Sequence, residues 1–234
     1  MTFSYPDFLT AQSVPADCQD PKAKPGTARQ RRPGLYRRLF KRTLDLGLIV
    51  LAAPVVVLLV AGLAVAVARD GGNPFYTQTR VGKDGRPFRM WKLRSMVTDA
   101  DTRMVEHLAR DPAARAEWDE TQKLKQDPRV TRMGTFLRRA SLDELPQLWN
   151  VLTGDMSLVG PRPMMPNQRD LYPGDAYYAL RPGITGFWQT AGRNRTTFEA
   201  RAGFDAAYEA DLTLWTDVKI LTRTVGVVVK CTGY

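Results

Sequence analysis

The stretch Arg138 to Pro163, RRASLDELPQLWNVLTGDMSLVGPRP, decides how the rest of the chain is organised. It places two adjacent acids, Asp143 and Glu144, between an arginine pair and Arg162, which is held between two prolines. At ~4 Å and an effective dielectric constant of ~20, two like unit charges repel by about 4 kcal/mol. A carboxylate that meets a phosphate therefore needs cations beside it, and this segment supplies them.

The same residues also have a structural interpretation. Ser141 and Glu144 have the spacing of a helix capping box, a pattern that is mostly structural when an apolar run follows. Against this, Pro146 comes late for a first-turn proline in the helix expected from Leu145 to Leu152. The prolines beside Arg162 exclude a helix there. An arginine presented so rigidly suits bidentate phosphate binding.

The central motif, SLDELPQLWNVLTGDMSLVGPRP at 141–163, is followed by RPGITGFWQTAGRN at 181–194. Together they resemble the small monotopic phosphoglycosyl transferases, also called bacterial sugar transferases. The resemblance runs from about Leu39 to the C-terminus and implies an enzyme that begins exopolysaccharide or other glycan assembly. The implied fold class is α+β: a helix-rich cytosolic domain with a β-hairpin, anchored by an N-terminal re-entrant membrane segment.

The resemblance also implies roles for individual residues. The Asp143 carboxylate would attack the β-phosphate of a UDP-sugar, release UMP and pass the phosphosugar to polyprenyl phosphate. Mg²⁺ is implied at Asp143, and phosphate binding at Arg138, Arg162 and Arg193. Glu144 would position or protonate, and its role stays open. The second nucleophile is already an anion and needs no strong general base, which agrees with the chain's single histidine.

Charge and composition limit the class of partner. The 234-residue chain is long enough for one domain with a core, and its net charge of +10 favours an anionic partner. Its two cysteines, Cys18 and Cys231, suggest neither a metal site nor a disulfide framework. A basic module for nucleic acid or lipid and a spanning scaffold of a polysaccharide export complex are the alternatives. Neither predicts the central motif, so no nucleic-acid partner is expected.

The N-terminal part divides into two segments. Residues 1–34 are rich in Pro, Ala and Gln and are expected to form a disordered basic tail. From Arg29 to Arg42 the chain has seven basic residues and no acid, directly before an apolar segment. This pattern favours a juxtamembrane arm on anionic lipid. Residues 35–70 are therefore assigned to the arm and membrane helix, and 71–234 to the catalytic domain.

The apolar segment Leu46 to Ala68 has 23 residues without a charge. As one helix it would be about 35 Å long, and a bilayer core is ~30 Å thick. A span would place everything after Arg69 outside the cytoplasm, where nucleotide sugars are not available. A kink at Pro54 would instead give two halves that are each too short to cross. The physics leaves both forms open.

The resemblance decides for the re-entrant form, with the catalytic domain on the cytoplasmic face of the bacterial inner membrane. Where the family has Ser-Pro at the break, this chain has Ala53-Pro54. Lys41 and Arg42, together with Asp45, match the basic motif that the family places at the lipid headgroups.

The remaining elements are predicted from local patterns. Phe75 to Ser95 should form a β-hairpin, with Lys92 and Arg94 on a solvated strand edge. Thr98 to Lys125 should be a helical insert. A helix is expected over Thr196–Asp211, and an amphipathic helix over Trp215–Lys230. Core packing is the default for its apolar face (Val218, Leu221, Val225 and Val229), and interfacial seating is the alternative.

The sugar and the assembly state are less determined. The insert before the acid pair and the aromatic residue Tyr234 look more like the hexose branch of the family, which uses UDP-galactose or UDP-glucose. The acetamido-sugar branch is the alternative. Glycines at 183, 186 and 192 permit turns and a close ligand approach. The sequence leaves open whether the chain forms a homo-oligomer.

Overall fold

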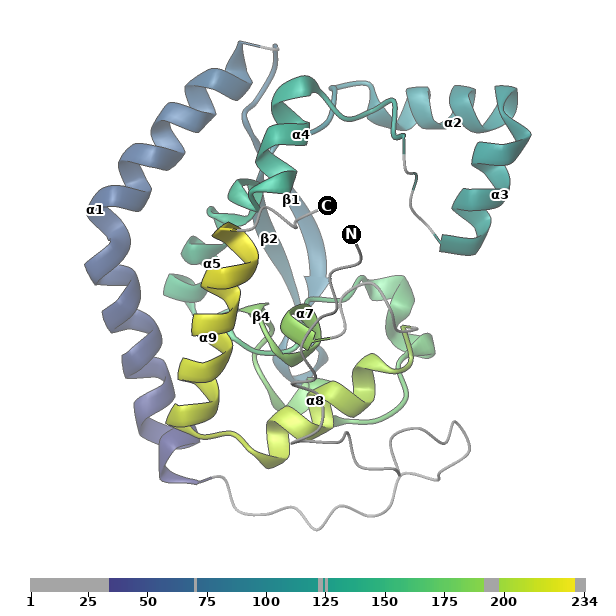
Figure 1. The fold of residues 1–234 in the computed structure, drawn as a ribbon. Coiled ribbons are helices and arrows are strands. Elements are labelled where there is room, and N and C mark those ends of the chain that lie inside the picture. Colours follow the sequence, from purple (N-terminus) through teal and green to yellow (C-terminus); the bar gives the residue numbers. More distant parts are fainter. Residues whose placement is uncertain (1–33, 70, 122–123, 125, 192–197, 230–234) are drawn as a thin grey trace, which may run out of the picture.

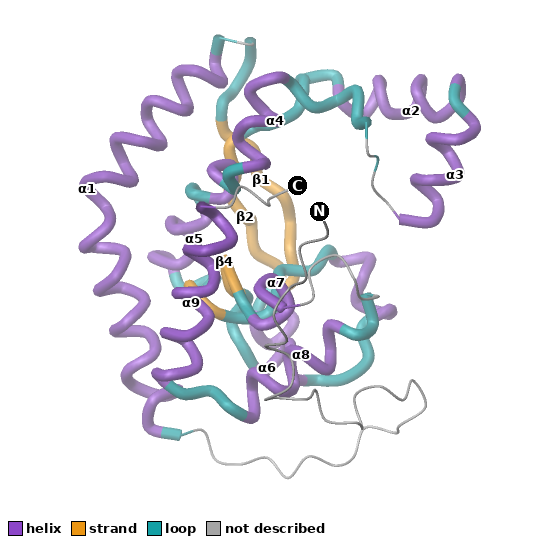
Figure 2. The backbone as a smooth tube through the Cα atoms, viewed as in Figure 1, coloured by secondary structure: helices purple, strands orange, loops and turns teal. Residues whose placement is uncertain are grey.

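The computed structural model describes residues 34–69, 71–121, 124, 126–191 and 198–229. The described part is mainly helical, with two small sheets between helices (Figures 1 and 2). The strands are β1 (Phe75–Val81), β2 (Pro87–Leu93), β3 (Ser157–Val159) and β4 (Gly183–Thr185). The α-helices are α1 (Lys41–Ala68), α2 (Ala100–Arg110), α3 (Pro112–Thr121), α4 (Arg132–Arg139), α5 (Gln147–Thr153), α6 (Ala176–Ala179), α7 (Phe187–Ala191), α8 (Arg201–Ala210) and α9 (Leu214–Val229). Shorter helical turns are η2 (Tyr36–Phe40), η3 (Lys83–Gly85), η4 (Leu142–Glu144) and η5 (Pro166–Leu171).

The predicted hairpin is confirmed. β1 and β2 are antiparallel, with Phe75 opposite Leu93 and Val81 opposite Pro87. The turn between them contains Asp84 and Gly85, both with positive φ. The side chains of Met90 and Lys92, two residues apart on β2, share one face of the strand, as the period of a strand requires. Met90 is buried in a core cluster with Val151 and Met156, so this face points into the domain.

The second sheet was not predicted. β3 and β4 pair in parallel, with Ser157 opposite Gly183. A Cβ on Gly183 would lie 2.1 Å from the backbone nitrogen of Gly160, and one on Gly186 would lie 2.2 Å from the Gly160 carbonyl oxygen. Glycine is therefore needed at these positions because two backbone segments touch. Gly192 lies outside the described residues.

Helix α1 follows η2 and continues through Pro54 as one element of 28 residues. The expected division into two helices at Ala53-Pro54 is not seen; instead α1 is bent about halfway along (Figure 1), and Pro54 is its fourteenth residue. Prolines are a usual cause of such bends. The helix from Tyr36 to Ala68 is long and apolar enough to cross a membrane. Several of its apolar side chains are more than 60% exposed: Val50, Leu51, Val55, Val57, Leu58 and Val65.

The N-terminal end of α1 is held against the domain by buried polar contacts. Lys41 Nζ lies 2.7 Å from Asp217 Oδ2 and 2.9 Å from the hydroxyl of Tyr208. Asp45 is 4% exposed and accepts a 2.7 Å hydrogen bond from Ser157 Oγ. These contacts give Lys41 and Asp45 a structural role inside the protein. Their assignment to the lipid headgroups stays a prediction.

Two further contacts fix α1 along its length. The guanidinium of Arg42 donates to the carbonyl oxygens of Val151 and Leu152 at the end of α5. At the other end of α1, Arg94 Nη2 donates to the carbonyl oxygen of Val67 over 3.1 Å. Val67 itself is buried against β2 and α4. Both ends of the long apolar helix therefore contact the same domain.

The predicted helical insert is confirmed as two helices, α2 and α3, which lie apart from the rest of the molecule in Figure 1. The predicted helix after residue 196 is also confirmed, as α8. In α9, the buried residues include Thr216, Asp217 and Ile220. Trp215 and Val225 are 75% and 63% exposed, so core packing is wrong for Val225.

A glycine in α4 controls how this helix sits on the hairpin. A Cβ on Gly134 would lie 1.9 Å from the carbonyl oxygen of Ser95. We expect Gly134→Ala to lower the free energy of unfolding by about 1–3 kcal/mol, because the helix must shift to make room. Gly226→Ala is the matched control, since nothing lies within 4 Å of its position. Urea denaturation of both variants checks this, and equal stability would contradict it.

Candidate active site

The acid pair lies in a short turn between α4 and α5. Ser141 has φ +55°, in the left-handed region, and its side chain caps no helix, so the capping box is not formed. The next three residues make the 3-10 turn η4, and α5 begins only at Gln147, after Pro146. Asp143 is consequently buried, with 7% of its surface exposed. A purely structural role as a helix cap is therefore wrong for this motif.

A lysine from the hairpin joins the two acids. Lys92 Nζ lies 3.4 Å from Asp143 Oδ2 and 3.0 Å from Glu144 Oε1. The expected position of Lys92 on a solvated strand edge is wrong, because the side chain is largely buried against η4. This ammonium group holds two carboxylates together that would otherwise repel each other.

Arg138 supplies a second cation from the last turn of α4. Its Nε donates a 2.9 Å hydrogen bond to Ser95 Oγ, which fixes the guanidinium beside the acid pair. Burial raises the pKa of Asp143, and the negative charge of Glu144 raises it further. The positive charges of Lys92 and Arg138 act in the opposite direction. The site thus contains a desolvated carboxylate whose ionised form depends on two neighbouring cations.

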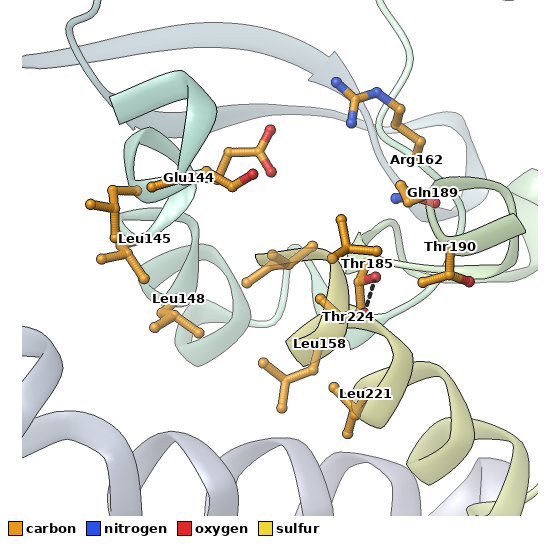
Figure 3. A pocket seen from close by; sticks show the side chains of 15 residues that line it. Glu144, Leu145, Leu148, Leu158, Arg162, Thr185, Gln189, Thr190, Leu221 and Thr224 are labelled. Atoms are coloured by element: carbon orange, nitrogen blue, oxygen red, sulfur yellow. Dashed lines mark hydrogen bonds between the residues drawn. The ribbon is translucent and has the colours of Figure 1, made fainter. Parts of the chain in front are cut away.

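A pocket of about 240 Å³ opens next to the acid pair. In Figure 3 Glu144 and Arg162 extend from opposite sides of it, Glu144 from η4 and Arg162 from the segment after β3. The guanidinium carbon of Arg162 lies 5.8 Å from the centre of the Trp188 ring. Lys92 and Arg138 thus lie close enough to Asp143 to affect its charge, while Glu144 and Arg162 both line the pocket. Arg193 lies outside the described residues.

The opposite end of the pocket is apolar. Leu145, Leu148, Leu158 and Leu221 line it, and in Figure 3 Leu148, Leu158 and Leu221 lie on the side toward α1. A hydrogen bond of 2.7 Å between Thr185 and Thr224 joins β4 to α9 in the pocket wall. The pocket therefore has a charged end near the acid pair and an apolar end that faces helix α1.

Sequence reasoning missed two polar side chains at this site. One is Lys92. It lies two residues after the apolar Met90, and this spacing could have indicated that both side chains face the domain interior. The other is Gln189 on α7, which lines the pocket beside Arg162. Both amide atoms of Gln189 are buried and find no hydrogen-bond partner within the described part of the chain. No local pattern in the sequence indicates that property.

The profile of the family described as "Bacterial sugar transferase" matches residues 36–231. This range covers the acid pair, the arginines and the apolar helix. The chain belongs to the bacterial sugar transferase family.

Curated relatives of this family member agree with that placement. The chain is 50% identical over 202 residues to a UDP-galactose-lipid carrier transferase of Erwinia amylovora, and 46% identical to an undecaprenyl-phosphate galactose phosphotransferase of Salmonella typhimurium. Each alignment covers 84% of this chain but only 42% of the relative. An exopolysaccharide production protein, ExoY, of Rhizobium meliloti is 41% identical over 82% of this chain and 87% of its own length.

Proposed function

We propose that this protein transfers a sugar 1-phosphate from a UDP-sugar to polyprenyl phosphate and releases UMP, which begins the assembly of an exopolysaccharide or related glycan. The observation that carries the proposal is the buried Asp143 carboxylate, which is influenced by Lys92 and Arg138 and whose neighbour Glu144 lines a pocket. The names of the relatives, which refer to undecaprenyl phosphate and galactose, support the same substrates.

The proposed reaction has two displacements at phosphorus. An Asp143 carboxylate oxygen attacks the β-phosphorus, the bond to the bridging oxygen breaks, and UMP leaves with that electron pair. An oxygen of polyprenyl phosphate then attacks the same phosphorus, and the carboxylate is released. Lys92 and Arg138 reduce the repulsion between the anions. Reducing ~4 kcal/mol of repulsion is worth about a thousandfold in rate. Glu144 either positions the nucleophile or acts as a proton donor.

Mg²⁺ fits this donor set only together with substrate. Among the described residues, no three His, Cys, Asp or Glu side chains gather into a protein-only metal site. Mg²⁺ is usually held by one or two carboxylates plus substrate phosphates, and Asp143 with Glu144 supplies that number. When bound there, it would neutralise charge on the diphosphate. Chelation followed by readdition of Mg²⁺ tests this assignment.

The contacts of α1 support a monotopic arrangement. The Asp45 end bonds to Ser157, and the Val67 end bonds to Arg94, both in the catalytic domain. A helix that crossed the bilayer would separate these ends by ~30 Å of hydrocarbon and leave one of them away from the domain. The proposal is therefore a helix that enters the cytoplasmic face of the inner membrane and returns to it, with the apolar residues of α1 in the lipid.

Cysteine accessibility tests this topology. In a chain with Cys18 and Cys231 replaced by serine, we introduce Leu35→Cys before the helix or Arg69→Cys after it. Both should react with a membrane-impermeant maleimide only after spheroplasts are permeabilised, because both ends of α1 stay on the cytoplasmic face. Ala113→Cys, exposed on α3, is the cytoplasmic control. Labelling of Arg69→Cys in intact spheroplasts would show that the helix spans.

The activity itself is tested by UMP release from a panel of UDP-sugars with purified membranes. UDP-galactose or UDP-glucose should give the fastest release, since two relatives at 46–50% identity are named for galactose. Preference for an acetamido sugar would place the chain in the other branch. No UMP from any donor, with polyprenyl phosphate present, would contradict the proposed reaction.

A further inference from the structure

A second group of cations lies beside Arg162, apart from the acid pair. The guanidinium of Arg201, the first residue of α8, lies 4.1 Å from the centre of the Trp188 ring, over which Arg162 also sits at 5.8 Å. Arg80 Nη1, from β1, donates a 3.3 Å hydrogen bond to the carbonyl oxygen of Pro163, the neighbour of Arg162. Three guanidiniums from distant parts of the chain thus meet around one loop.

In the part of the chain that the structure describes, these three cations lack ionic partners. Within the described residues, none of them forms an ion pair with a carboxylate, and the Nε atoms of Arg80 and Arg201 are buried without a hydrogen-bond acceptor. Burial and the charge of Arg162 lower the pKa of Arg80 and of Arg201 to about 10. Glu144 acts in the opposite direction on Arg80, and Asp205 does so on Arg201. Unpaired buried charges are costly, so the cluster is expected to hold an anion.

The acid that acts on Arg201, Asp205, does not supply a full counter-charge. Asp205 accepts a 2.9 Å hydrogen bond from the hydroxyl of Tyr172, and burial raises its pKa to about 7. Its carboxyl group is therefore partly neutral near physiological pH. The contacts of Arg201 with Trp188 and Phe198 place its guanidinium but bring no negative charge.

We propose that Arg80, Arg162 and Arg201 bind the phosphate of the departing UMP. This inference rests on the proposed function, in which the β-phosphate lies at Asp143 and the α-phosphate must lie next to it. Arg162 lines both the pocket that contains Glu144 and the small cavity that contains Arg201, so the arginine group adjoins the pocket at the acid Glu144. When the bond between the β-phosphorus and the bridging oxygen breaks, the new charge forms on UMP, where guanidiniums stabilise it.

The placement favours the nucleotide over the phosphate of the lipid acceptor. The acceptor carries a long apolar chain, and the apolar end of the pocket, lined by Leu148 and Leu221, lies toward α1 (Figure 3). In the same view Arg162 lies at the other end, away from α1. A phosphate at the three arginines would thus be far from the side where a polyprenyl chain can remain in lipid.

Equilibrium binding of UMP and of uridine to the full-length protein in detergent tests the site without turnover. Arg80→Gln and Arg201→Gln should each weaken UMP binding about tenfold or more, the effect of losing a charge-assisted hydrogen bond. Uridine, which has no phosphate, should bind as it does to the parent. Arg201→Lys keeps the charge and should retain much of the UMP affinity. Arg103→Gln, on the exposed arm, is the matched control.

Each outcome decides the proposal. A selective loss of UMP affinity in both glutamine variants supports it. Unchanged UMP affinity, or an equal loss for UMP and uridine, overturns it and leaves Arg201 a structural residue that packs on Trp188. Competition by polyprenyl phosphate at this site would overturn the choice of nucleotide. UMP and uridine binding are measured without transfer, so an error in the nucleophile assignment would not change these results.

Discussion

Replacing Asp143 with asparagine should reduce UMP release at least a thousandfold, because the amide cannot bond to phosphorus as the carboxylate does. The variant should remain folded. Burial raises the pKa of Asp143 above its usual value. The free energy of unfolding therefore falls as pH rises from the usual pKa of an aspartate to the raised pKa in the folded protein. A neutral side chain of the same shape removes this cost. Initial rates of UMP release with UDP-galactose and polyprenyl phosphate give the measurement.

The matched control for this variant is Asp119→Asn. Asp119 is an exposed acid of the arm that pairs with Arg115, four residues earlier in α3. Its replacement should leave UMP release within about twofold of the parent, because surface pairs contribute little. If Asp143→Asn released UMP at the same rate as Asp119→Asn, the nucleophile would have to be another residue.

The second large effect is expected for Lys92→Met. This change removes the cation that touches both Asp143 and Glu144 and leaves two acids side by side. We expect at least a hundredfold loss of UMP release, since like charges at this range repel by several kcal/mol. Lys92→Arg, which keeps the charge, should lose less. Lys83→Met, in the hairpin turn, is the control that should behave as the parent.

The pH dependence of Lys92→Met separates an electrostatic role from a structural one. The positive charge of Lys92 lowers the pKa of Asp143, so its removal raises that pKa further. Because the attacking carboxylate must be ionised, the acid limb of the rate profile should move to higher pH in the variant. A profile of unchanged shape with a lower maximum would mean that Lys92 acts only by holding β2 against η4.

The parts of the site that could be predicted lie in one continuous segment. Asp143, Glu144 and Arg162 are close in sequence, and the prolines around Arg162 restrict the backbone enough to indicate a rigid cation. The hairpin was predictable because its turn residues and strand periodicity are local signals. The long apolar helix was likewise predictable from composition alone.

The parts that could not be predicted depend on contacts between distant segments. Arg80 and Arg201 lie more than 100 residues apart in the sequence, and neither stands in a pattern that indicates a ligand. The parallel pairing of β3 with β4 joins two three-residue strands, which are too short to show periodicity. Lys41 and Asp45 were assigned to the membrane surface, yet their partners are Asp217 and Ser157, which only the fold brings near.

How α1 lies in the membrane could be predicted only in part from the sequence. Length and composition allow both a span and a re-entrant helix, and Pro54 alone does not distinguish them. What favours the re-entrant form is tertiary: the two ends of α1 bond to Ser157 and Arg94 of one domain. Those bonds join residues that are far apart in the sequence, so an analysis of short sequence segments cannot predict them.

The most direct test of the central claim is transfer of label to the protein itself. Purified protein is mixed with UDP-galactose carrying radioactive galactose, without any polyprenyl phosphate, and is then denatured. We predict a labelled polypeptide that loses its label to hydroxylamine after denaturation, or to polyprenyl phosphate added before denaturation, and no label on Asp143→Asn. UMP release that always requires the acceptor, with the polypeptide unlabelled throughout, would contradict the covalent mechanism.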